Sequence, residues 1–67
     1  MKFGENLKLL RKQKNLTQQQ LSNSLGVDRT TVMKWETGHY ETNFEMLIKI
    51  ADFFDVSVDY LIGRKDY

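Results

Sequence analysis

Residues 16–38 have the sequence LTQQQLSNSLGVDRTTVMKWETG, which reads as two short helices joined by a tight turn. Thr17 can cap the first helix, and Gln20 three residues later completes a capping-box pattern. Gly26 can adopt the left-handed conformation that ends a helix without a Cβ clash. The pattern therefore predicts a helix that begins after Thr17 and ends at Gly26.

The second helix of this stretch has two chemically different faces. Asp28 is a good N-cap for this helix, and Gly38 can end it. At about 100° per residue, Val32 and Trp35 lie together on one side, which we expect to be buried. The opposite, outer face carries two cations and a hydroxyl but no acid: Arg29, Thr30, Met33 and Lys34.

This outer face has the chemistry of a helix that reads DNA. In the major groove, Arg and Lys side chains reach guanine edges or phosphates, and Thr can contact thymine methyl groups. The alternative is an ordinary solvated helix face, because Arg, Thr and Lys are common surface residues. The helix by itself does not decide between these two interpretations, so its flanks have to be considered.

With its flanks, the stretch resembles the helix-turn-helix of the phage repressor and Cro family, whose members are also called XRE-type regulators. The resemblance implies an all-α, lambda-repressor-like fold: five helices in one domain over residues 1–67, with the helix-turn-helix at 17–36. The matching residues extend over nearly the whole chain and are Leu16-Thr17-Gln18, Leu21, Leu25-Gly26-Val27, Thr31-Val32, Lys34-Trp35-Glu36, Gly38, Leu47, Ile50-Ala51, Val56-Ser57 and Leu61.

Length and composition fit one small globular domain. The 67 residues include no cysteine, which excludes disulfides and thiolate metal sites, and a single histidine, which excludes a His-rich metal cluster. No apolar run approaches the roughly 18 residues of a membrane span, and no signal peptide is visible. We therefore expect a cytoplasmic protein with no metal, no cofactor and no small-molecule ligand.

The charge of the chain is unevenly distributed although its net value is only +1. Residues 1–34 carry seven Lys and Arg against two acids, or +5, whereas residues 35–67 carry three against seven, or −4. The candidate recognition helix lies in the basic part, and such polarity steers a polyanion towards one face. Chance asymmetry in a small protein is the alternative explanation.

Seven further residues are candidate contacts to DNA phosphate: Lys12, Lys14, Thr17, Gln18, Thr31, His39 and Tyr40. Lys12 and Lys14 lie on the solvent side of a predicted first helix, and the start of the second helix presents unpaired N–H groups. The resemblance implies that Gln18 either contacts phosphate or braces the recognition helix. For His39 and Tyr40, a solvent-exposed loop after the recognition helix is an equal alternative.

The resemblance also implies a structural ion pair between Arg11 and Glu36, which would tie the first helix to the end of the recognition helix. A fourth helix is predicted over residues 44–54, with Asn43 as its cap, and a short fifth helix after Ser57. The expected core stripe of the fourth helix is Phe44, Leu47, Ile50, Ala51 and Phe54.

The predicted function is that of a sequence-specific DNA-binding transcriptional regulator, acting as a repressor homodimer on a two-fold operator. In the family that the chain resembles, pairing uses the fifth helix, which here points to Val58, Tyr60 and Ile62. A small interface of this kind would form chiefly on DNA. Alternatively, these three residues cover the core beneath the fourth helix.

Two other functional classes compete with DNA binding. An antitoxin or adaptor that binds another protein would expose an apolar patch on the outer face, where Met33 is the sole apolar residue, so DNA is favoured. An enzyme is disfavoured because there is no Cys, one His and no pair of carboxylates placed opposite a nucleophile. Double-stranded DNA is therefore the expected partner.

Overall fold

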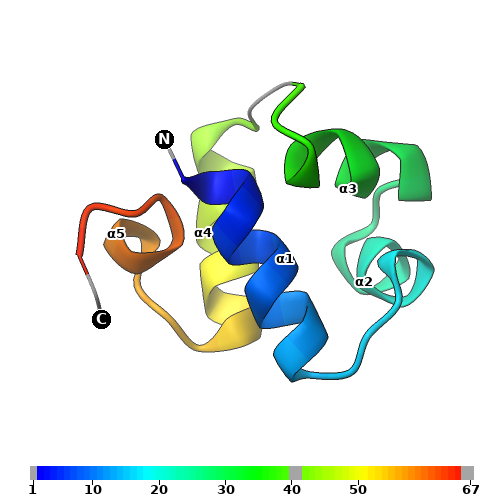
Figure 1. Ribbon diagram of the computed structural model, residues 1–67, viewed down its shortest axis with the longest axis horizontal. Helices are drawn as coiled ribbons and strands as arrows, with labels where there is room; N and C mark the ends of the chain where they lie inside the picture. The colour runs from blue at the N-terminus through cyan, green and yellow to red at the C-terminus, as the bar shows by residue number, and fades with distance from the viewer. Residues whose placement is uncertain (1, 40–41, 66–67) are drawn as a thin grey trace.

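The computed structural model describes residues 2–39 and 42–65, and over these residues it contains helices and no strand (Figure 1). The helices are α1 (Phe3–Gln13), α2 (Gln18–Leu25), α3 (Arg29–Glu36), α4 (Phe44–Phe54) and α5 (Val58–Leu61). This arrangement confirms the predicted all-α architecture. Within the described part of the chain, no helix has the length and apolar character needed to cross a membrane.

Four of the helices begin at the capping residues that the sequence indicates. The Thr17 hydroxyl accepts the N–H of Gln20 at 3.0 Å, and the Gln20 side-chain oxygen accepts the N–H of Thr17 at 2.8 Å, which completes a capping box. Asp28, Asn43 and Ser57 accept one backbone N–H each at the starts of α3, α4 and α5. Local polar chemistry therefore sets these boundaries.

The helix ends also follow from single residues. Gly26 ends α2 in the left-handed region with φ of 76°, and Gly38, with φ of 78°, follows α3. Asp55 ends α4 in the same region with φ of 57°, a conformation that aspartate tolerates better than most residues with a Cβ. The turn at Gly26 brings α2 and α3 together as a helix-turn-helix.

The core contains side chains from all five helices: Phe3, Leu7, Leu10, Leu21, Leu25, Val32, Trp35, Ile50, Ala51, Phe54 and Leu61. One predicted member, Phe44, is wrong, because its side chain is 68% exposed. Phe44 is the first residue of α4, and the Cα–Cβ bonds of a helix tilt towards its N-terminus. We attribute the exposure to this tilt, which directs the Phe44 side chain beyond the last layer of the core.

Contacts at both ends fix the helix-turn-helix to the rest of the molecule. The Trp35 ring of α3 packs edge-on against Phe3 of α1, with ring centroids 6.0 Å apart. The Trp35 indole N–H is buried without a hydrogen-bond partner among the described residues. At the other end, Lys49 Nζ of α4 donates to the Leu25 carbonyl at 2.9 Å, at the end of α2.

Candidate nucleic-acid interface

The outer face of α3 is exposed and its inner face is buried. Val32 and Trp35 are 0% and 2% exposed, and they hold the helix on the core. The exposed side chains of the outer face are those expected from the sequence, namely Arg29, Thr30, Met33 and Lys34. This helix therefore presents two cations and a hydroxyl to solvent on a rigid support.

The first turn of α3 is fixed by Asp28. Its Oδ1 atom accepts the backbone N–H of Thr31 at 2.8 Å and the Thr31 hydroxyl at 2.6 Å. These two hydrogen bonds lower the pKa of the Asp28 carboxyl below its ordinary value of 3.8, and the nearby charge of Lys34 lowers this pKa further. The Thr31 hydroxyl is therefore engaged in capping, which differs from the phosphate contact expected from the sequence.

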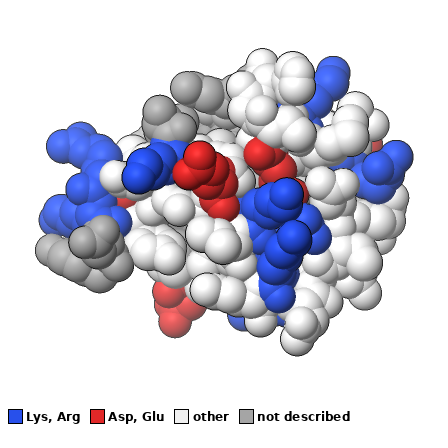
Figure 2. All heavy atoms as spheres, viewed as in Figure 1, with Lys and Arg blue, Asp and Glu red and all other residues white. Residues whose placement is uncertain are grey.

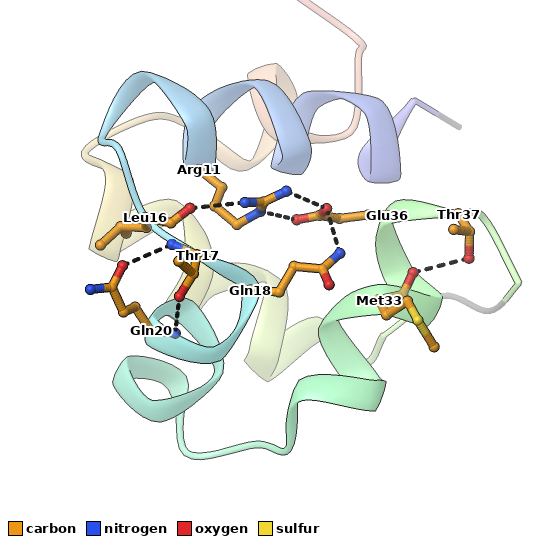
Figure 3. A network of polar contacts seen from close by, with 8 residues as sticks. All are labelled: Arg11, Leu16, Thr17, Gln18, Gln20, Met33, Glu36 and Thr37. Atoms are coloured by element: carbon orange, nitrogen blue, oxygen red, sulfur yellow. Dashed lines mark hydrogen bonds and ion pairs between the residues drawn. The ribbon is translucent and has the colours of Figure 1, made fainter.

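A buried carboxylate joins α1, α2 and α3 (Figure 3). Glu36 accepts Arg11 Nε at 2.7 Å and Arg11 Nη2 at 3.0 Å, which is a bidentate ion pair. The side chains of Arg11 and Glu36 are only 10% and 2% exposed. Arg11 Nη1 also donates to the Leu16 carbonyl at 2.8 Å, in the segment that leads into α2. The ion pair implied by the resemblance is thus present and buried.

The Gln18 side chain braces the recognition helix. Its Nε2 atom donates to Glu36 Oε1 at 3.1 Å, so the first residue of α2 is tied to the last residue of α3 (Figure 3). The Gln18 side chain is half-buried. Gln18 can still offer an anion the second hydrogen of its Nε2 atom and its backbone N–H at the start of α2.

The other candidate phosphate contacts lie on the surface. Lys12, Lys14 and Thr17 are exposed, at the end of α1 and the start of α2. His39 is exposed just after α3, with its Nδ1 atom 2.7 Å from Thr37 Oγ1. Tyr40 lies outside the described residues. The exposed members thus flank both ends of the helix-turn-helix.

Basic side chains do not merge into one patch on the face seen in Figure 2. Lys and Arg atoms form separate groups there, and acidic side chains lie between two of them. The difference in charge between the two halves of the sequence therefore does not become a continuous basic surface on this face.

The residues expected to mediate pairing are half-buried. Val58 and Tyr60 pack against the hydrophobic core, and Ile62 follows α5 with part of its surface exposed. Val58 and Tyr60 therefore cover the core, as the alternative interpretation held, and still keep exposed surface.

Sequence reasoning missed two polar residues that hold the site in place. Lys49 anchors the end of α2 through the Leu25 carbonyl, and Asn6 of α1 donates to backbone carbonyls of α5. Each is a single polar residue on a helix surface and makes a contact to a distant part of the chain. No local periodicity or cap pattern marks such a residue.

Comparison with known proteins places this geometry in a family. A helix-turn-helix family model matches residues 7–61. The HTH-type transcriptional activator BcrR of Enterococcus faecalis is 46% identical over 66 residues, which cover 98% of this chain and 32% of the relative. The cryptic phage CTXphi transcriptional repressor RstR of Vibrio cholerae is 41% identical over 64 residues, covering 96% of this chain and 57% of the relative.

A solved structure agrees with these matches. The P22 c2 repressor protein, in complex with synthetic operator 9T, superimposes with a TM-score of 0.86 at 28% identity, covering 94% of this chain and 96% of that one. The present chain spans about a third of BcrR and just over half of RstR. From the matched residues and the shared fold, we conclude that the chain belongs to the helix-turn-helix family of XRE type, which includes phage repressors.

Proposed function

We propose that this chain is a sequence-specific DNA-binding transcriptional regulator that inserts α3 into the major groove. The observation that carries the proposal is the exposed outer face of α3, with Arg29, Thr30 and Lys34 on a helix fixed by buried contacts. Arg and Lys recognise guanine edges and phosphates in that groove. Because the relatives are named as regulators of transcription, the same role is the natural one here.

The mode of regulation that we propose is repression by occupancy. Among the similar proteins, RstR and P22 c2 are named as repressors, whereas BcrR is named as an activator. A domain that sits on a two-fold operator excludes polymerase from overlapping sequence without any chemistry of its own. We accordingly propose a cytoplasmic protein with no catalytic activity and no cofactor.

Specificity would come from a homodimer. One recognition helix reads only a few base pairs, and pairing places two such helices about one helical turn apart on DNA, roughly 34 Å. Val58, Tyr60 and Ile62 are the proposed pairing residues, since neutral apolar residues suit a surface that must contact its own copy. The patch is small, so we expect the dimer to form chiefly on DNA.

A protein-binding module on the same scaffold is the second candidate function. One observation favours it, because Phe44 is 68% exposed. Phe44 lies at the start of α4, however, and the outer face of α3 carries a single apolar side chain, Met33, which is 38% exposed. DNA therefore remains the ligand that the outer face fits better.

Selection from a random-sequence duplex library tests the proposal. Wild-type protein should enrich a consensus with two-fold symmetry, whereas a triple variant, Arg29→Ala with Thr30→Ala and Lys34→Ala, should enrich none. Gln13→Ala is a suitable control, since Gln13 is exposed on α1 away from the outer face. If the triple variant selected the wild-type consensus, α3 would not be the reading helix.

A further inference from the structure

Helix α5 is too short to hold its own orientation. It contains four residues, Val58–Leu61, which is about one turn, and an isolated helix of that length is unstable in water. Its direction must therefore be set by its contacts with the rest of the molecule. This matters because α5 carries two of the three proposed pairing residues, so the inference below rests on the proposed function.

Asn6 of α1 provides the polar contact at the C-terminal end of α5. Its Nδ2 atom donates to the Tyr60 carbonyl at 3.0 Å and to the Leu61 carbonyl at 3.2 Å. These carbonyls belong to the last turn of α5, where helix carbonyls lack partners within the helix, and the Tyr60 carbonyl also accepts the backbone N–H of Gly63 at 3.1 Å. The backbone N–H of Lys2 adds a third link, to the Ile62 carbonyl at 3.3 Å.

Side-chain packing holds α5 on the core through Leu61, which is fully buried, but the surface beside Tyr60 is hollow. A surface hollow of about 350 Å³ lies between the start of α1 and the end of α5. Its lining is polar for the most part and consists of Lys2, Asn6, Tyr60, Gly63 and Lys65. Because no apolar layer fills this space, the hydrogen bonds of Asn6 add a directional constraint, beside the packing of Leu61, on how the end of α5 sits on α1.

The same turn of α1 is packed tightly against the recognition helix. The Phe3 ring contacts the Trp35 ring edge-on, and a Cβ added at Gly4 would collide with the Trp35 carbonyl. The first turns of α1 therefore touch α3 on one side and α5 on the other. Figure 1 shows this arrangement, with α1 between α5 and the pair formed by α2 and α3.

We propose that Asn6 is a positioning residue that sets the orientation of α5 relative to α3, and thereby the spacing between the two half-sites that a dimer prefers. In a dimer paired through α5, the distance between the two copies of α3 depends on the angle between α5 and α3 within each protomer. Half-sites on DNA are separated by whole helical turns of about 10–10.5 base pairs. If the angle between α5 and α3 became variable, the dimer would therefore accept a wider range of half-site spacings.

The test compares Asn6→Ala with Gln13→Ala on the consensus duplex that the wild-type protein selects. Gln13 is a matched control because it is also an amide on α1, is exposed, and its side chain makes no hydrogen bond with the described residues. Three duplexes are needed: the consensus, a version with one half-site scrambled, and versions whose half-site centres are moved by single base pairs. Hydrogen–deuterium exchange of the α5 amides provides a readout that does not require DNA.

For Asn6→Ala we expect single half-site binding within about twofold of wild type, since Asn6 is not on the outer face of α3. Cooperative binding to two half-sites should fall about fivefold, which is the factor that one net hydrogen bond provides, and the preference for one spacing should broaden. Exchange of α5 amides should accelerate while that of α2 and α3 does not. Gln13→Ala should match wild type in every measurement.

Two results would overturn the inference. Equal losses on one-site and two-site DNA would show that Asn6 merely supports the fold, and unchanged exchange in α5 would show that Asn6 does not hold it. If Asn6→Ala does not fold, the milder Asn6→Ser serves in its place and should give the same pattern. A wild-type protein that selects no consensus would instead refute the proposed function, and the exchange experiment alone would then decide the role of Asn6.

Discussion

Gln18 and Glu36, the first residue of α2 and the last residue of α3, are joined by a hydrogen bond of 3.1 Å. The same carboxylate accepts two N–H groups of Arg11, so three donors from two different helices converge on it. Because the Glu36 side chain is only 2% exposed, this charge has little contact with water and depends on these donors. The relative orientation of α2 and α3 therefore depends on the buried carboxylate of Glu36.

Removal of Arg11 should destabilise the domain severely. Arg11→Ala leaves the Glu36 carboxylate buried without its counter-charge, which costs about 3–5 kcal/mol of unfolding free energy when a buried pair is broken. Gln18→Ala removes one hydrogen bond to a charged group and should cost about 1.5 kcal/mol. Urea unfolding measures both, and the exposed neighbour Lys12→Ala should change stability by less than about 0.5 kcal/mol. Similar midpoints for all three variants would contradict the dependence of the fold on this pair.

Arg29 should determine sequence preference and not merely affinity. Arg29→Ala should weaken operator binding by about 1–3 kcal/mol and relax the preference at one or two base positions. Competition binding against operators with single base changes measures both effects. Lys12→Ala, which removes only a proposed phosphate contact, should weaken binding to all sequences alike. A uniform loss with Arg29→Ala would place this residue on the phosphate backbone.

Affinity should fall steeply with salt if DNA is the ligand. Each phosphate that a cation neutralises contributes about −0.9 to the slope of log affinity against log salt concentration. With Lys12 and Lys14 each engaged with one phosphate, these two residues should contribute about −1.8 to the slope per protomer. Titrations between about 50 and 200 mM salt measure it, and Lys12→Ala should make it shallower by about 0.9. A flat dependence would exclude these contacts.

Acid should weaken the start of the recognition helix. The pKa of Asp28 is lowered in the folded state by the hydrogen bonds from Thr31, so the charged carboxyl stabilises the fold. This contribution is fully present above pH 3.8 and is lost as the pH falls through the lower, folded-state pKa. The stability advantage of wild type over Asp28→Asn should therefore shrink below that pH, in urea unfolding at several pH values. A constant difference down to strongly acidic pH would contradict this assignment.

Tyr60→Asp should prevent dimer formation without unfolding the domain. Tyr60 is half-buried, and a carboxylate there would face its own copy across the proposed two-fold axis. Sedimentation with and without operator DNA should show the wild-type protein pairing on DNA and the variant failing to pair, while circular dichroism reports whether the variant is folded. If the folded variant still bound two half-sites cooperatively, the interface would have to lie elsewhere.

The fold could be predicted largely from local chemistry. Thr17 with Gln20, Asp28, Asn43 and Ser57 are caps whose side chains bond to residues only three positions away, so the sequence contains both partners. Helix boundaries follow directly from such short-range pairs.

What the sequence could not supply depends on three-dimensional context. Phe44 fits the apolar period of α4, but a helical wheel contains no information on where the core ends along the helix axis. The resemblance allowed Gln18 to bind phosphate or to brace α3, and the bracing bond became visible only with the position of Glu36. Asn6 bonds to carbonyls 54 and 55 residues away, which leaves no local signal.

The buried Trp35 is also an intrinsic fluorescence probe of the recognition helix. It is the sole tryptophan of the chain, it is 2% exposed, and its indole N–H has no partner among the described residues. An indole in such an apolar, non-hydrogen-bonded setting emits fluorescence at short wavelength and moves to longer wavelength when water reaches it. The emission wavelength of unlabelled protein therefore reports whether α3 is packed against α1. In a variant that fails to bind DNA, it distinguishes displacement of the recognition helix from the loss of side chains that contact DNA.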